Sequence, residues 1–100
     1  MKKTPISARK DKTYKFLLFV SGMSSKSISA TENFRSIADE YLGDDFELEI
    51  IDIRKDRQLA LQYQLIGLPT LIKLNPQPTR VILGDLSEKE KVLKILNIIE

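Results

Sequence analysis

Cysteine and histidine are both missing from the sequence. Without cysteine there are no disulfide bonds and no thiol redox chemistry, and the usual Cys and His ligands of zinc sites are absent. Without histidine there is no Ser-His-Asp set and no imidazole for acid–base catalysis. No glycine-rich phosphate loop is present, and no carboxylate pair or lysine stands out as a catalytic group. We therefore predict a protein that is not an enzyme, with no catalytic residue, no cofactor and no metal.

Long apolar runs are also missing. The longest run near the N-terminus is Phe16-Leu17-Leu18-Phe19-Val20, which is far too short to span a bilayer. No apolar core of a secretory signal precedes it. We expect a cytoplasmic protein with no membrane partner.

The basic residues are unevenly distributed. Six of the sixteen lysine and arginine residues fall within residues 1–15, where only Asp11 is acidic, and the other 85 residues hold ten basic and thirteen acidic side chains. A nucleic-acid surface needs basic residues on a folded face, so no nucleic-acid partner is expected. Residues 1–12 carry Pro5 and show no periodicity. We predict a mobile or disordered basic tail over 1–12, which is a solvated extension or a binding arm, and one folded domain over 13–100.

The first half of the domain reads as strand, helix, strand. The stretch Tyr14–Val20 is a strand that becomes apolar on both faces, which is typical of a central position. A helix is predicted from Lys26 to Leu42, and Phe46–Ile53 is a second strand. Apolar residues recur at helical spacing on one face of this helix: Ala30, Phe34, Ile37, Ala38 and Tyr41. Ser24, Ser25 and Ser27 are expected to cap its start.

The second half reads as helix, strand, strand, helix. Asp56 can cap a short helix that ends near Ile66, with Leu59, Tyr63 and Ile66 on one side. Strands over 69–74 and 79–83 flank a turn with two prolines and should form a hairpin. Ser87 and Glu90 have the spacing of a capping box, so we predict a last helix over 88–98 with Ser87 as its N-cap.

The order βαβαββα predicts an α/β fold with a mixed four-stranded sheet and helices on both faces, which is the thioredoxin-like layout. The segment Ile66-Gly67-Leu68-Pro69-Thr70-Leu71 resembles the thioredoxin segment that carries a cis-proline, so Pro69 is expected to be cis in this fold. Thioredoxins have their dithiol just after the first strand. Residues 21–27 hold serines there instead, so the resemblance concerns the scaffold and not the redox chemistry.

A closer resemblance, to the KaiB family, covers residues 12–96. Its segments occur in order and at similar spacing: Lys12-Thr13-Tyr14, Phe19-Val20-Ser21-Gly22, Ile51-Asp52-Ile53, Gln58-Leu59-Ala60, Pro69-Thr70-Leu71, and Gly84-Asp85-Leu86-Ser87 followed by Glu90-Lys91-Val92-Leu93. The resemblance implies a non-enzymatic protein-interaction module that regulates a KaiC-like ATPase in timing or stress control and forms a homo-oligomer when free. It leaves open an alternative, the sensor or input domain of a clock-linked histidine kinase.

The resemblance also implies two possible folds, because cyanobacterial KaiB has a ground-state fold and a thioredoxin-like fold that differ in the C-terminal half. The amphipathic pattern from Ser87 to Ile99 favours the thioredoxin-like form here.

The predicted partner-binding residues are Glu47, Glu49, Lys55 and Gln64. Glu47 and Glu49 stand where cyanobacterial members are neutral and basic, and Gln64 replaces a lysine. Charge reversal at an interface rejects the wrong partner. The two glutamates are either a partner-reading strip or an ordinary exposed strand face.

Overall fold

The computed structural model describes residues 13–99. The predicted basic tail, residues 1–12, lies outside the described residues. The elements follow the predicted order: β1 (Tyr14–Val20), α2 (Ser25–Tyr41), β2 (Phe46–Asp52), α3 (Arg57–Gln62), β3 (Thr70–Asn75), β4 (Arg80–Leu83) and α4 (Lys89–Ile95).

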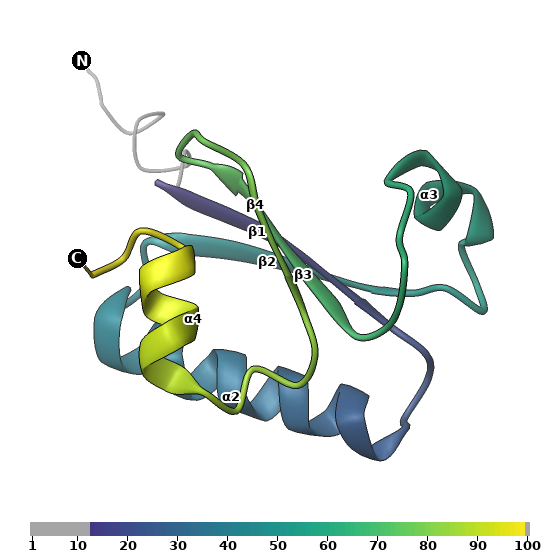
Figure 1. The fold of residues 1–100 in the computed structure, drawn as a ribbon, viewed down its shortest axis with the longest axis horizontal. Coiled ribbons are helices and arrows are strands. Elements are labelled where there is room, and N and C mark those ends of the chain that lie inside the picture. Colours follow the sequence, from purple (N-terminus) through teal and green to yellow (C-terminus); the bar gives the residue numbers. More distant parts are fainter. Residues whose placement is uncertain (1–12, 100) are drawn as a thin grey trace.

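The sheet is mixed and has the strand order β2-β1-β3-β4. Strands β1 and β2 pair in parallel, with α2 as the connection between them. Strand β3 pairs antiparallel with both β1 and β4, so the predicted hairpin is confirmed. Figure 1 shows α2 and α4 on one side of the sheet, with α3 beyond the end of β2 on the other.

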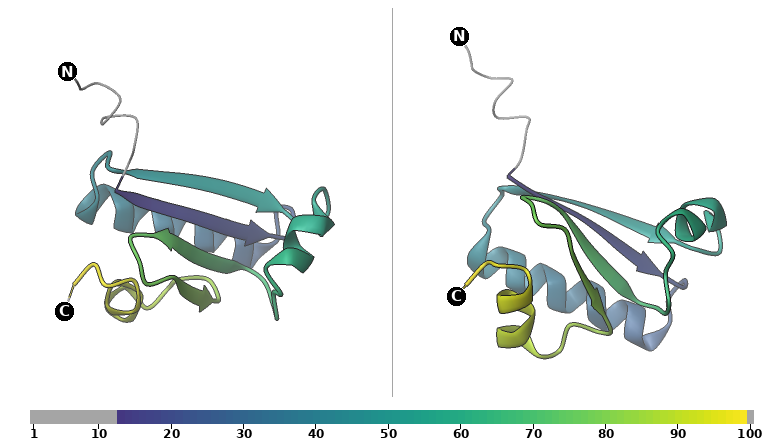
Figure 2. Two further views of the ribbon diagram at one scale, coloured as in Figure 1. Left: turned by 90° about the horizontal axis from the view of Figure 1, so that it is seen from above. Right: turned by 45° about the horizontal axis from the view of Figure 1, so that its top comes forward.

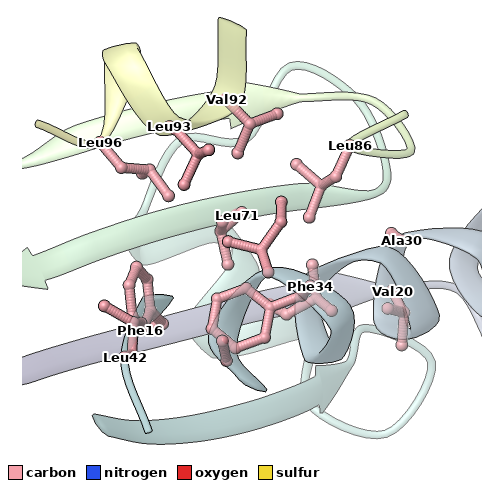
Figure 3. Packing of buried hydrophobic residues seen from close by; sticks show 13 residues of the cluster. Phe16, Val20, Ala30, Phe34, Leu42, Leu71, Leu86, Val92, Leu93 and Leu96 are labelled. Atoms are coloured by element: carbon pink, nitrogen blue, oxygen red, sulfur yellow. The ribbon is translucent and has the colours of Figure 1, made fainter. Parts of the chain in front are cut away.

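The side chains of β1 alternate between two apolar clusters. Phe16, Leu18 and Val20 belong to the larger cluster, which α2 and α4 cover, and Figure 3 shows its packing. Leu17 and Phe19 belong to a smaller cluster with Ile51 and Ile72. We call the side of the sheet that bears the smaller cluster the open face, because α3 covers only one end of it (Figure 2, left). Thus β1 is buried on both sides, as predicted, and the helices lie on both faces.

Ser24 is the N-cap of helix α2, and its hydroxyl accepts a hydrogen bond from the Ser27 amide at 3.3 Å, so serine capping is confirmed. Phe34 packs edge-on against Phe16 at 4.8 Å between ring centroids. The prediction that Tyr41 is a core residue is wrong. Leu42 enters the core in its place, and the exposed Tyr41 ring lies 5.5 Å from the Lys89 amino group.

Helix α3 is shorter than predicted. Asp56 caps it as expected, with Oδ1 accepting from the Leu59 amide at 3.1 Å. Leu59 and Tyr63 pack on the open-face cluster, but Ile66 is 90% exposed, so the prediction that it shares their side of the helix is wrong. The cause is Gln64, whose φ of 55° ends the helical path and turns the following residues outward.

The Leu68–Pro69 peptide bond is cis, as the resemblance to thioredoxins implies. The bonds before Pro76 and Pro78 are also cis. Pro69 is buried, and its carbonyl oxygen accepts a hydrogen bond from the Gly84 amide at 2.9 Å. This bond fastens the beginning of β3 to the end of β4.

The predicted N-cap at Ser87 is wrong. Helix α4 begins at Lys89, with Glu88 at the N-cap position and no side-chain capping bond. The Ser87 amide instead donates to Asp85 Oδ1 at 3.1 Å, and the buried Leu86 has a φ of 64°. Because Leu86 must enter the core, the chain takes up helical geometry only after residue 88. Glu90 lies in the first turn, where a negative charge interacts favourably with the helix dipole.

Lys73 connects the sheet to α4. Its side chain is 1% exposed, and its amino group donates to the carbonyl oxygen of Leu96, the C-cap of α4, at 2.9 Å. A cation at this position complements the helix dipole. Burial lowers the pKa of the Lys73 ammonium, and the positive charge of Arg80 on the adjacent strand lowers it further.

The observed start of α4 predicts that alanine substitutions at Ser87 and Asp56 lower the free energy of unfolding by different amounts. Ser87→Ala should change the free energy of unfolding by less than about 0.5 kcal/mol, because no cap is lost. Asp56→Ala should lower it by about 1 kcal/mol, because a real N-cap is lost. Urea unfolding followed by circular dichroism measures both. Equal losses for the two variants would contradict the assigned start of α4.

The buried Lys73 predicts a pH-dependent stability. Its pKa is lower in the folded chain than in the unfolded chain, so the unfolded state binds more protons between the two values and stability rises with pH there. Lys73→Met removes the titrating group at similar volume. The free energy of unfolding of the parent, relative to Lys73→Met, should increase as the pH rises toward the ordinary lysine pKa. A difference that stays constant with pH would show that the Lys73 pKa is not lowered.

Candidate interaction surface

The serines of the loop after β1 form hydrogen bonds with one another and with the backbone. Ser24 and Ser27 hydroxyls lie 2.8 Å apart, and Ser27 Oγ accepts from the Ser21 amide at 3.2 Å. These serines therefore serve to fix the start of α2. Within residues 13–99, no group of three or more acidic, histidine or cysteine side chains is placed to hold a metal ion.

Asp52 ties this loop to the end of β2. Its Oδ1 accepts from the Gly22 amide at 3.2 Å, and its Oδ2 accepts from Arg54 Nη2 at 2.9 Å. The Arg54 guanidinium holds the pKa of the Asp52 carboxyl well below its usual range, chiefly through this side-chain hydrogen bond. Gly22 has a φ of 58°, and a Cβ there would lie 2.5 Å from Arg54 Cζ. The loop is thus fixed beside one end of the open face.

Glu47 and Glu49 form an acidic strip on the open face. They alternate with apolar residues along the edge strand β2 and are paired across the sheet with Lys15 and Leu17. Both are exposed. A hollow of about 430 Å³ lies between β2, β1 and β3 at this end. Its lining consists of four apolar residues and three charged ones: Phe16, Leu17, Leu48 and Leu74, with Lys15, Glu47 and Glu49.

A second hollow, of about 400 Å³, lies at the other end of the open face, around α3. Its lining is mainly apolar: Ile53, Arg57, Ala60, Leu61, Gln64, Leu65, Ile66, Gly67 and Leu68. Leu61 is 72% exposed and Ile66 is 90% exposed beside it. Exposed apolar side chains that gather beside an apolar hollow mark a candidate contact surface for another molecule.

The segment that leads from α3 to β3 passes close to the end of β4. A Cβ on Gly67 would lie 3.0 Å from Leu83 Cδ1, so the segment runs close to that side chain. Val81 and Leu83 are themselves exposed on the same face of the sheet. The open face therefore has apolar side chains at its α3 end and along β4.

The four predicted partner-binding residues fall into two groups. Glu47 and Glu49 lie together near the beginning of β2, and Gln64 lines the hollow at the α3 end. Lys55 is exposed in the turn between β2 and α3, where its amide donates to the Asp52 carbonyl at 2.9 Å. The glutamates and Gln64 line different hollows. The open face is thus acidic at one end and has Lys55 and Arg57 near the other.

Sequence reasoning missed Leu61 and Ile66. Helical spacing assigns Ile66 to the buried side of α3, and nothing in the local pattern marks the left-handed turn at Gln64. The short length of α3, which exposes Ile66, is known only from the structure.

Comparison with known proteins agrees with this architecture. Residues 17–98 match the family model of the KaiB domain. The chain is 40% identical over 82 residues to the circadian clock oscillator protein KaiB of Microcystis aeruginosa, a match that spans 82% of this chain and 79% of that protein. KaiB1 of Synechocystis is 39% identical over 82 residues, covering 82% of this chain and 78% of that one. The chain belongs to the KaiB family.

Solved structures show the same fold at lower identity. The N-terminal domain of Synechococcus elongatus SasA superposes with a TM-score of 0.72 at 20% identity, covering 100% of this chain and 94% of that domain. Chloroplastic thioredoxin z gives 0.71 at 18% identity, covering 91% of this chain and 81% of that one. This KaiB relative therefore has the thioredoxin-like form. Among residues 13–99, no helix has the length and apolarity needed to cross a membrane.

Proposed function

We propose that this KaiB-family chain is a non-enzymatic interaction module that binds its protein partner with the open face. The observation that carries the proposal is the pair of exposed apolar side chains, Leu61 and Ile66, beside a hollow of about 400 Å³. Burying a leucine or isoleucine side chain contributes about 1.5–3 kcal/mol, so these two residues can serve as anchors for a partner.

The partner proposed from the family resemblance is a KaiC-like ATPase, in timing or stress control. The acidic strip supports the proposal that this chain distinguishes between different KaiC-like ATPases. Glu47 and Glu49 are exposed, and no basic side chain of residues 13–99 lies within 4.0 Å of them. Their charge is therefore available to attract a basic partner surface and to repel an acidic one. The apolar end of the open face would supply affinity and the acidic end would supply selectivity.

The alternative function is that of a sensor or input domain related to a clock-linked histidine kinase. In that case the open face would contact a different protein. The superposition with the SasA N-terminal domain over the whole chain is a likeness of fold and fits both alternatives. The choice of partner distinguishes them, so the experiment includes both candidate partners.

Removing the apolar anchors should weaken partner binding. In titration calorimetry with the purified KaiC-like ATPase of the same genome, the double variant Leu61→Ser, Ile66→Ser should bind at least about tenfold more weakly, a loss of about 1.4 kcal/mol. Both side chains are exposed, so the fold should remain intact by circular dichroism.

Met23→Ser is the matched control, because Met23 is 80% exposed and lines a different hollow, with Ile28 and Ile50 beside α2. It should bind like the parent. An equal loss for Met23→Ser, or no loss for the double variant, would contradict binding through the α3 end of the open face. Binding to a histidine kinase and not to the ATPase would support the alternative.

A further inference from the structure

The acidic strip lies beside the point where residues 1–12 join the fold. The Thr13 amide donates to Asp45 Oδ1 at 2.8 Å, and the Thr13 carbonyl oxygen accepts from Asn75 Nδ2 at 2.7 Å. These two bonds fix the chain where it enters β1. Two residues later, Lys15 is paired with Glu47 on the neighbouring strand, at a spacing of about 4.8 Å between strands.

The surface at this point is a groove lined by apolar and charged residues. Leu17 and Leu74 line the hollow of ≈ 430 Å³, and Glu47, Glu49 and Lys15 line it as well. Helix α3 lies at the opposite end of the strands and leaves this part uncovered (Figure 2, left). The groove therefore combines apolar side chains with two carboxylates and the single amino group of Lys15, and this acidic excess suits an extended segment with basic side chains.

Residues 1–12, which directly precede Thr13, are a segment of this kind and are long enough to reach the groove. Residues 1–12 contain five basic side chains and one acidic one, Asp11. The basic positions are Lys2, Lys3, Arg9, Lys10 and Lys12. Glu47 and Glu49 are about 7 Å apart along β2, at about 3.3 Å per residue. An extended residue spans about 3.3–3.6 Å, so a chain that turns back from Thr13 brings several of these cations to the strip.

We propose that residues 1–12 dock on the acidic strip of the same chain and cover this end of the open face when no partner is bound. A tethered segment has a high effective concentration at a site beside its anchor, so weak charge contacts suffice to hold it. A partner that binds the strip must then displace the segment. That consequence rests on the proposed function, whereas the docking itself does not.

The absence of cysteine allows a direct test on the full chain. A nitroxide label on the variant Ser7→Cys is unique, and its paramagnetic effect on amide signals reports which residues lie near the segment. Docking predicts strong loss of signal at Leu17, Glu47, Glu49 and Leu74. The loss should largely disappear in 1 M salt, where the Debye length is about 3 Å.

Charge variants in the labelled protein complete the test. Glu47→Gln with Glu49→Gln should abolish the signal loss on the open face. The matched control, Glu32→Gln with Asp39→Asn, neutralises two exposed acidic residues of α2 and should leave it unchanged. The proposal is overturned if the labelled parent shows no loss at the strip, or if neutralising the strip has no more effect than the control.

A mixed sample distinguishes the chain's own segment from that of a second copy. Isotope-labelled protein without nitroxide is combined with nitroxide-labelled protein without isotope. Docking within one chain predicts no signal loss in this mixture, and loss at the strip would overturn the proposal in favour of an intermolecular contact. Because these measurements use no partner, failure of the docking leaves the proposed function standing, and failure of partner binding leaves the docking standing.

Discussion

The burial of β1 on both sides is the constraint on which the rest of the structure depends. Phe16, Leu18 and Val20 require cover on one side of the sheet, and Leu17 and Phe19 require it on the other. Two helices, α2 and α4, provide the first cover. The short α3 provides the second only at one end, so part of that side remains available. The proposed partner surface exists because helices cover one side of β1 completely and the other side only at one end.

The C-terminal half depends on how α4 is held. Val92, Leu93 and Leu96 enter the larger cluster, and Lys73 reaches through it to the Leu96 carbonyl. A buried lysine is costly unless it is hydrogen-bonded, so this contact is favourable only when α4 lies on the sheet. The thioredoxin-like form therefore combines ordinary apolar packing with one polar contact that requires a specific position of the helix.

Much of the fold can be predicted from the sequence, because its strong signals are local. Alternation in Phe46–Ile53 identifies the acidic strip, and the two-sided apolar pattern of Tyr14–Val20 identifies the central strand. The wrong predictions arise where packing between residues distant in the sequence decides the local structure. Burial of Leu86 overrides the capping box at Ser87, and Leu42 replaces Tyr41 in the core.

The candidate surface could be predicted only in part. The exposure of Glu47 and Glu49 can be predicted from the alternation of polar and apolar residues in β2. The exposure of Ile66 instead depends on the left-handed backbone conformation of Gln64. A glutamine at a φ of 55° has no sequence signature, since glycine and asparagine are the usual residues there. Of the four predicted partner-binding residues, only Gln64 lines the α3 hollow.

Hydrogen exchange of the free protein and of its complex with the proposed partner, a KaiC-like ATPase, locates the binding surface. We expect slower exchange on binding in peptides that cover Phe46–Asp52 and residues 57–68, with unchanged exchange across α2. Protection confined to α2 or α4, with none in residues 57–68, would contradict the assignment of the open face as the surface that binds the partner.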